Sequence, residues 1–279
     1  MQVITRYFQS NSISVYPLGD IHIGDKCFGA ESKHKLEGYI RWIKNNPNAY
    51  AVLMGDIVNC ATINSPSSPW QQDMDLTDQI KAAVRYFEPI KGKILGAIDG
   101  NHEQRLSKYA GYSPTISICE RLGIPFLEHS AVIIFRLGCC KKGFVSNPTT
   151  SKPRASFVGY FHHTTGGGGT IGGKINRVAL LTSIVADADF YCGAHNHQLA
   201  VAHRIIEVID RTYSRAETLR QLLVDCGGYL EWHGSYAEQK QLSPLKIGSP
   251  RINLFIKRKR RGDPKAHILD VQKDIHVSI

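Results

Sequence analysis

The sequence predicts a layered α/β fold, and three observations support this prediction. Three short apolar runs in the first half each end in polar residues and precede a polar loop or a segment with helical spacing. The second half contains more β-type runs than the first. Acidic residues and histidines gather directly after the early runs, where open α/β sheets place their binding sites. We therefore expect a polar site at the carboxyl ends of the strands.

Strand and helix units alternate through the first half of the chain. Polar residues 9–12 separate the first two β-rich runs, which predicts an opening hairpin. Leu36, Ile40 and Ile43 recur at the spacing of one helix face, and the Asn-Asn-Pro run at 45–47 ends that helix. We expect strands at 4–8, 13–18, 50–54 and 94–98 and helices at 31–44 and about 76–87.

The second half is predicted to be mostly strands, with one helix at about 175–186. Residues 141–153, which contain Pro, Gly, Ser and Lys, are expected to form a surface loop. Neither an internal repeat nor a linker divides the sequence. The expected strands are 131–137, 156–161, 190–192, 199–209, 222–226, 252–257 and 268–271.

Composition excludes several classes of protein. The 279 residues, 42% of them hydrophobic, can bury a substantial core. Apolar stretches such as 131–135 are far shorter than the ~20 residues of a membrane-spanning helix. The start of the chain lacks the apolar region of a secretory signal, so we expect a cytoplasmic protein, or one of the host cytoplasm if a phage encodes it. Seven scattered cysteines without a CxxC pair argue against a disulfide framework and a thiolate zinc site.

Five short polar segments at the ends of predicted strands contain the residue types that bind metals. Any one of them arises often by chance, and a buried histidine is usually a hydrogen-bonded core residue. Their order along the chain is the informative feature. The segments are Asp20-Ile21-His22, Gly55-Asp56, Gly100-Asn101-His102-Glu103, Phe161-His162-His163 and Gly193-Ala194-His195-Asn196-His197.

This order resembles the calcineurin-like metallophosphoesterases, whose pattern is DxH, GDxx(D), GNH(D/E), H and GHxH. The match runs from Asp20 to His197, about two thirds of the chain. Two positions depart from the pattern: Asn59 stands where many members have Asp, and Ala194 interrupts the Gly-His pair. Neither position is a metal ligand in the family, so the resemblance still implies a complete metal site.

The resemblance implies a four-layer αββα sandwich, in which two mixed β-sheets are flanked by helices and a dimetal site lies at the carboxyl ends of the strands. One domain is expected over residues 1–279. Its motif-bearing core would cover about 13–210, and the strands over 222–279 would complete the second sheet.

The resemblance also implies a set of metal ligands. Asp20, His22 and His197 would hold one ion, Asn101, His162 and His195 the other, and Asp56 would bridge them. Carboxylate, imidazole and amide donors without a thiolate suit Mn²⁺, the first candidate, and also Fe, Zn, Co or Ni. Two such ions can share a hydroxide and direct it at phosphorus.

His102 resembles the family's general acid, which Asp20 would orient; a structural histidine beside the ligands is the alternative. Arg105 is expected to bind a phosphate oxygen, unless it is a solvated surface residue. The His162-His163 pair is ambiguous because neighbours on a strand point to opposite sides. His162 is expected to be the ligand, while His163 faces the phosphate or packs against the sheet. Family members with one histidine before a glycine run would instead align to His163.

A glycine run at 166–169 is followed by a near match to a P-loop, but Ile175 replaces the required Ser or Thr. We interpret the run as a loop that lets substrate approach, with Lys174 near a helix start available to a phosphate. The glycine run after this histidine pair resembles the runs in phage and bacterial members of the family.

The class of substrate that we expect follows from the charge of the chain. The net charge of +10 and the basic run at 257–261 favour a polyanionic partner, although such a run is usually a solvated hairpin tip. We expect a phosphodiesterase, with a nuclease acting on DNA or RNA as the favoured form. The alternatives are a phosphomonoesterase or protein phosphatase with the same dimetal centre and a non-catalytic metal-binding protein. Oligomeric state cannot be inferred from the sequence.

Overall fold

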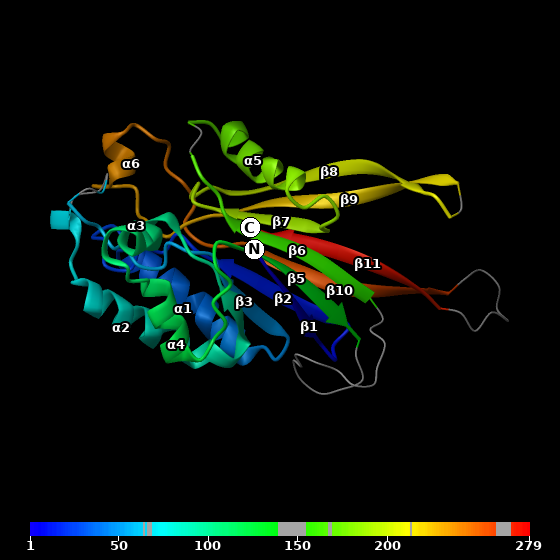
Figure 1. Ribbon diagram of the computed structural model, residues 1–279, viewed down its shortest axis with the longest axis horizontal. Helices are drawn as coiled ribbons and strands as arrows, with labels where there is room; N and C mark the ends of the chain where they lie inside the picture. Colours follow the sequence, from blue (N-terminus) through cyan, green and yellow to red (C-terminus); the bar gives the residue numbers. More distant parts are fainter. Residues whose placement is uncertain (64, 66–68, 139–154, 167–168, 213, 261–268) are drawn as a thin grey trace.

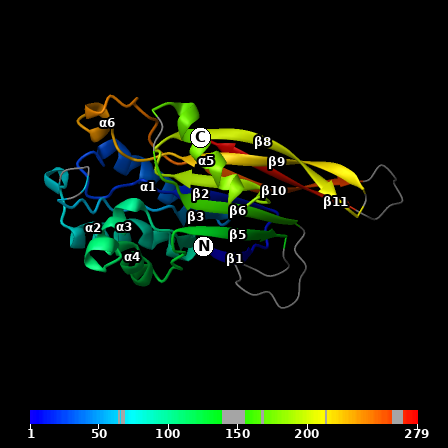
Figure 2. The ribbon, with the colours of Figure 1, turned by 45° about the horizontal axis from the view of Figure 1, so that its top comes forward.

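Two β-sheets pack face to face and helices cover their outer faces in the computed structural model of the chain (Figures 1 and 2). This confirms the predicted αββα sandwich. Among the described residues, no helix is long and apolar enough to cross a membrane. The structure describes all residues except 64, 66–68, 139–154, 167–168, 213 and 261–268, so the whole of the expected surface loop at 141–153 lies outside the described residues.

The larger sheet has six strands in the order β1-β5-β6-β7-β9-β8. Pairing is parallel for β1 with β5, β6 with β7 and β7 with β9, and antiparallel for β5 with β6 and β8 with β9. The sheet is therefore mixed. Its strands are β1 (Gln2–Tyr7), β5 (Ser130–Leu137), β6 (Ala155–His163), β7 (Phe190–Ala194), β8 (Leu199–Asp210) and β9 (Arg215–Cys226).

The smaller sheet has five strands in the order β11-β10-β2-β3-β4. Strands β2, β3 and β4 are parallel, as the strand–helix units predicted, while β10 is antiparallel to β2 and to β11. Its strands are β2 (Ser12–Leu18), β3 (Ala49–Leu53), β4 (Ile94–Ala97), β10 (Arg251–Arg260) and β11 (Leu269–Ser278).

Helices cover the outer faces and the ends of the strands. The helices α1 (Ala30–Asn45), α2 (Leu76–Phe87) and α4 (Pro114–Leu122) pack on the smaller sheet, and α5 (Ile171–Leu180) packs on the larger one. The others are α3 (Asn101–Ala110), α6 (Tyr236–Gln239) and the short 3₁₀ helices η1 (Pro69–Gln71), η2 (Glu88–Lys93) and η3 (Leu181–Ser183). Helix α5 begins four residues earlier than expected because Thr170 Oγ1 accepts a hydrogen bond from the Gly173 N–H and caps it.

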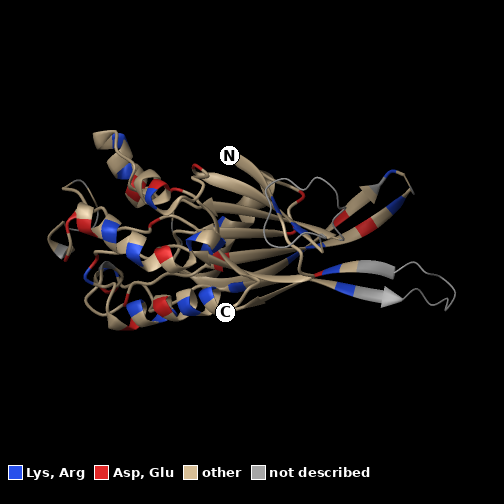
Figure 3. Ribbon diagram, turned by 90° about the horizontal axis from the view of Figure 1, so that it is seen from below, with Lys and Arg blue, Asp and Glu red and all other residues tan. Residues whose placement is uncertain are grey.

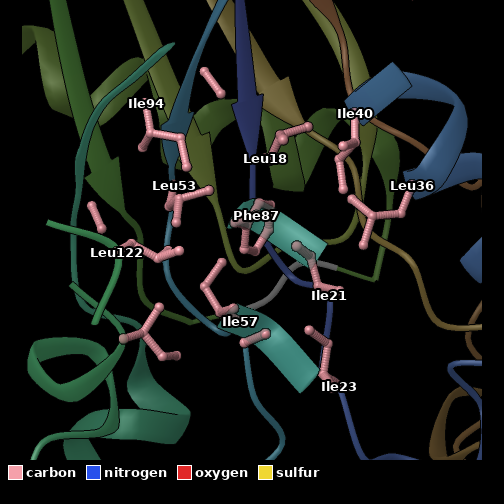
Figure 4. Close-up of a cluster of buried hydrophobic side chains, with 14 of the residues drawn as sticks. Leu18, Ile21, Ile23, Leu36, Ile40, Leu53, Ile57, Phe87, Ile94 and Leu122 are labelled. Carbon is pink, nitrogen blue, oxygen red and sulfur yellow. The ribbon is translucent and has the colours of Figure 1, made fainter. Parts of the chain in front are cut away.

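The strands of the smaller sheet are apolar on both faces because both faces are covered. In β3, Ala51 and Leu53 face the helices α1 and α2, whereas Val52 faces the other sheet. Figure 4 shows the helix side, with Phe87 of α2 among side chains of the strands and of the loops that follow them. A second cluster lies between the sheets, and a third between the larger sheet and α5. Alternating side chains thus build the four layers.

Two expectations about strand pairing are wrong. Strands β1 and β2 form no hairpin, because β1 pairs with β5 in the larger sheet and β2 joins the smaller one. The connection lets Phe8 and Ile13, which flank the polar residues, both bury in the cluster between the sheets. The strands expected over 222–279 also do not all join one sheet. Strand β9 lies in the larger sheet, whereas β10 and β11 extend the smaller sheet beyond β2.

The packing between the sheets predicts a large loss of stability for Phe135→Ala. Phe135 is fully buried, and its ring centroid lies 5.9–6.3 Å from those of Phe8, Phe161 and Phe190. We expect the free energy of unfolding in urea to fall by about 3–5 kcal/mol. Ile205→Ala, at a side chain 68% exposed, is the control and should change it by less than about 0.5 kcal/mol. A loss below ~1 kcal/mol for Phe135→Ala would contradict this assignment of the core.

Candidate metal centre

The five polar segments meet at one end of the sandwich. Asp20 and His22 follow β2, Asp56 follows β3, and Asn101 begins the helix after β4. His163 ends β6, and His195 and His197 follow the neighbouring strand β7. Helices α3 and α6 lie at this end, on the left of Figure 1, and the long hairpins extend to the right. The predicted position at the carboxyl ends of the strands is therefore correct.

Several candidate ligands have left-handed backbone conformations. Left-handed φ angles are rare for residues other than glycine and persist where the surrounding structure holds them, which is common at functional sites. Nine such residues occur in the described part of the chain, and five belong to the site. These five are Asp20 (φ 51°), His22 (φ 54°), Asp56 (φ 48°), His195 (φ 80°) and His197 (φ 53°).

Two glycines and one carboxylate hold the Asp56 loop. A Cβ on Gly100 would lie 2.1 Å from the Asp56 nitrogen, and one on Gly55 would lie 2.5 Å from the Gly100 Cα. The fully buried Glu103 carboxylate accepts hydrogen bonds from the N–H groups of Asp56, Ile57 and Val58 at 2.7–3.1 Å. The acidic residue after the GNH motif therefore fixes the loop that carries Asp56.

The first group of candidate metal ligands consists of Asp20, His22 and His197. One ligand atom from each lies within 4.8 Å of the others. The Nε2 atoms of His22 and His197 are 3.2 Å apart, and Asp20 Oδ1 lies 3.9 Å from His197 Nε2. The His195 N–H donates to Asp20 Oδ2 at 2.7 Å, while Oδ1 is buried without a hydrogen-bond partner among the described residues. This oxygen is available to a cation.

The second group consists of Asp56, His163 and His195, whose ligand atoms also lie within 4.8 Å of one another. Asn101 Oδ1 joins it, at 2.9 Å from His163 Nε2 and 2.7 Å from His195 Nδ1. Asp56 Oδ2 lies 3.4 Å from His163 Nε2 and 3.9 Å from His22 Nε2, so it stands between the two groups.

The donor set fits cations. His163 Nδ1 donates to the Met54 carbonyl at 2.8 Å, so in the neutral ring Nε2 presents a lone pair to the oxygens of Asn101 and Asp56. A cation bound by these three atoms would remove the repulsion between their lone pairs. Without one, burial lowers and the Asp56 carboxylate raises the pKa of His163, with a net value of about 10.

Burial also sets the charge of the other donors. It lowers the pKa of His22 and His195 and lowers that of His197 to about 3, which keeps these imidazoles neutral, the form that binds metals. Burial raises the pKa of Asp20 to about 7, although the nearby His163 and the hydrogen bond from the His195 N–H oppose this. These two groups of buried and partly buried Asp and His side chains are thus suited to bind metal ions, and His22, Asp56 and His102 form a third group between them.

The structure brings His163, and not His162, into the cluster, so the expectation for His162 is wrong. Side chains alternate along β6, and His162 turns to the face of Tyr160, with ring centroids 6.2 Å apart. His163 is the last residue of β6, level with Ala194 on β7, and points to the end of the neighbouring sheet. Which member of a His-His pair faces inward depends on strand register, which the motif does not encode.

His102 lies beside the cluster. Its Nδ1 contacts the Asn59 carbonyl oxygen at 2.6 Å, and its Nε2 lies 3.8 Å from Asp56 Oδ2. The backbone of Asn59, and not the side chain of Asp20, therefore orients the ring. The departure from the family pattern at this position leaves that contact intact, because a main-chain carbonyl serves for any residue type.

A pocket of about 880 Å³ opens on the cluster. Arg105 and Lys174, the other two residues expected at the phosphate, both line it. Arg105 Nε donates to the Asn101 carbonyl at 3.3 Å, and Nη1 has no hydrogen-bond partner among the described residues. Burial lowers the pKa of Lys174, and the nearby Asp225 opposes this.

Sequence reasoning missed much of the pocket wall. Residues 228–247 supply nearly half of the lining residues, and their sequence shows neither a motif nor a periodic pattern. The buried pair Asn196 and Asp225, joined by a 3.2 Å hydrogen bond behind the site, was missed as well. Asn196 stands inside the fifth segment, which was a usable signal, whereas Asp225 lies near the end of β9, in a sequence without a motif.

The polar segments and the two-sheet sandwich together resemble the calcineurin-like metallophosphoesterases. Neither the scan of protein-family models nor the search of curated proteins found a match. A solved structure of a conserved uncharacterized protein, a predicted phosphoesterase, from Streptococcus pneumoniae TIGR4 is similar, with a TM-score of 0.35 and 12% identity over 95% of this chain and 98% of that chain. The functional interpretation therefore depends on the residues at the strand ends.

The two adjacent histidines provide a matched test of the cluster. We expect His163→Ala to weaken Mn²⁺ binding about tenfold or more, because it removes a donor between Asp56 and Asn101. His162→Ala should leave binding within about twofold, because this ring faces away. Calorimetric titration with Mn²⁺ gives both values, and loss of binding in His162→Ala alone would contradict the geometry.

Proposed function

We propose that this protein is a metal-dependent phosphoesterase that hydrolyses phosphodiesters with two divalent ions, Mn²⁺ first among them. The observation that carries the proposal is the convergence of seven nitrogen and oxygen donors in two groups that meet at Asp56. Four of the seven residues line the pocket: His22, Asn101, His195 and His197. The proposed ligands are Asp20, His22 and His197 on one side, Asn101, His163 and His195 on the other, and Asp56 between them.

Ions bound by these ligands would lower the pKa of a water molecule and neutralise charge on the phosphoryl group. The chain's own contribution begins with Asp56. Its Oδ1 accepts a hydrogen bond from the main-chain N–H of His102 at 2.8 Å, while its Oδ2 faces the histidines of both groups. This carboxylate therefore couples the position of the ligands to that of His102.

His102 is the proposed general acid. With Nδ1–H donating to the Asn59 carbonyl, the proton for a leaving group must be held at Nε2 of the charged ring. Burial lowers the pKa of His102, and Asp56 opposes this. An anionic ester bound beside the ring would oppose the effect of burial and raise the pKa, because an opposite charge favours the imidazolium. Substrate binding would thus favour the protonated form of His102.

Positive side chains support an anionic substrate. The pocket is lined by four cationic residues, Lys26, Arg105, Lys174 and Lys246, and by one acidic residue, Asp25. A cleft with one sign of charge attracts the opposite charge. Its volume leaves room for organic groups on both sides of a phosphate, which favours a diester. The four cations also suit a dianion, so a phosphomonoesterase or protein phosphatase is the second candidate.

A nuclease acting on DNA or RNA is the form of the proposal that the +10 charge favours. Of the basic run at 257–261, residue 261 and the side chains of 258–260 lie outside the described residues. Lys257 pairs with Asp274, and strands β10 and β11 extend away from the metal end. Figure 3 shows basic and acidic residues interspersed along the hairpins and helices. The presence of every proposed ligand and of His102 argues against a non-catalytic metal-binding protein.

Replacing Asp56 by Asn tests the shared ligand. We expect the variant to lose both ions, because the charge between the two groups disappears. Metal content after dialysis, measured by mass spectrometry, gives the result. Asp78→Asn, at a carboxylate 56% exposed on α2, is the control and should keep both ions. Two ions retained per chain in the Asp56 variant would contradict the bridging role.

His102→Ala tests catalysis separately from metal binding. With a dinucleotide diester, whose alkoxide leaving group needs a proton, and Mn²⁺, we expect kcat to fall by about 10²- to 10⁴-fold while metal content is kept. His34→Ala, at an exposed histidine of α1, should have normal activity. Undiminished turnover in the His102 variant would remove its catalytic role, and a wild type that cleaves p-nitrophenyl phosphate far better than the diester would favour the phosphomonoesterase.

A further inference from the structure

Residues 228–247 form a long loop that closes on itself beside the metal centre. Gly228 and Gly248 pair as an isolated bridge, and the Gly248 N–H donates to the Gly228 carbonyl at 2.9 Å. Apart from the short helix α6, the loop has no regular structure. Loops longer than about 12–15 residues are uncommon in compact domains and are usually functional. We call it the 228–247 loop.

Backbone contacts attach the base of this loop to the site. The Tyr229 N–H donates to the Asp20 carbonyl at 2.9 Å, and a Cβ on Gly228 would lie 2.8 Å from His197 Nδ1. The Glu231 N–H donates to the Cys27 carbonyl at 2.8 Å, and its Oε1 accepts from the Glu31 N–H at 3.0 Å in the first turn of α1. The loop is therefore held against the metal centre.

The loop presents apolar side chains to the same pocket that the metal-binding histidines line. Leu230 and Ile247 also pack against the cluster under the smaller sheet, which anchors them. Trp232 Nε1 donates to the Leu242 carbonyl at 2.7 Å, which fixes the indole and links the two sides of the loop. The apolar residues of the loop that line the pocket are Leu230, Trp232, Ala237, Leu242, Leu245 and Ile247.

We propose that the 228–247 loop binds a ring-bearing organic group esterified to the phosphate, so that the substrate is a nucleotide-sized phosphoester. This inference rests on the proposed function. One end of the pocket offers metal-binding donors and cations for a phosphate, and the loop offers a fixed indole and aliphatic side chains for the face of a ring. The volume of about 880 Å³ lies within the range of small-molecule sites.

Binding of two phosphonates that are not hydrolysed gives the first test. In Mn²⁺-loaded protein, phenylphosphonate should bind about tenfold or more tightly than methylphosphonate, because the phenyl ring is buried on the loop. Trp232→Ala should reduce this ratio at least about fivefold. Trp70→Ala, at an indole 86% exposed and outside the pocket lining, is the matched control and should leave the ratio unchanged. A ratio near one in the wild type would overturn the inference.

Hydrolysis of two diesters with one leaving group gives the second test. Thymidine 5′-p-nitrophenyl phosphate and methyl p-nitrophenyl phosphate both release p-nitrophenolate, so their kcat/KM ratio reports the other ester group. We expect a ratio of about ten or more, reduced in Trp232→Ala and in Leu245→Gln, which makes the wall polar with little change of size. A thymidine ratio near one beside a strong phenyl preference in binding would assign the loop to aryl groups instead of nucleobases.

The two proposals fail in different ways. Ring preference in binding without hydrolysis of any ester would contradict the phosphoesterase and support the loop assignment. Metal-dependent hydrolysis with neither preference would support the phosphoesterase and overturn the loop assignment. Faster cleavage of duplex DNA than of the thymidine diester would also overturn it, because a duplex does not enter a pocket of this size.

Discussion

The arrangement of the site depends on one buried carboxylate. Asp56 is 1% exposed, and its carbonyl accepts the N–H groups of Ile21 and His22. One side-chain oxygen accepts a hydrogen bond from the main-chain N–H of His102. The other faces the imidazoles of His22 after β2, His102 on α3 and His163 on β6. A buried charge is costly unless other groups compensate it, so the loops after three neighbouring strands must approach Asp56 closely. Gly55 and Gly100 permit that approach, and Glu103 holds the loop in place.

The second group also joins the two sheets. His163 ends a strand of the larger sheet, and its Nδ1 contacts the carbonyl of Met54, at the end of β3 in the smaller one. The distance between the ligands therefore depends on the packing of the phenylalanines between the sheets. A pocket needs donors held within fractions of an ångström, and a densely packed interface between sheets provides this rigidity.

Much of this could be predicted from sequence, where the signal is local or ordered. Strand–helix alternation predicted β2, β3 and β4 with α1 and α2, and the family that the five segments resemble implied the four layers. The predictions that were wrong concern contacts between residues far apart in the sequence. Nothing in residues 1–18 says that β1 pairs with β5, and strand register alone decides between His162 and His163. The 228–247 loop is irregular, so its place beside His197 follows from tertiary contacts, not from periodicity.

The five left-handed ligand residues have a consequence for folding. Each has a conformation that an isolated chain rarely adopts, so the unfolded chain lacks a preformed site. Ions that bind the folded arrangement and not the unfolded one shift the equilibrium between them by mass action. The loops at the strand ends would then gain order with a rising concentration of any divalent ion that binds them.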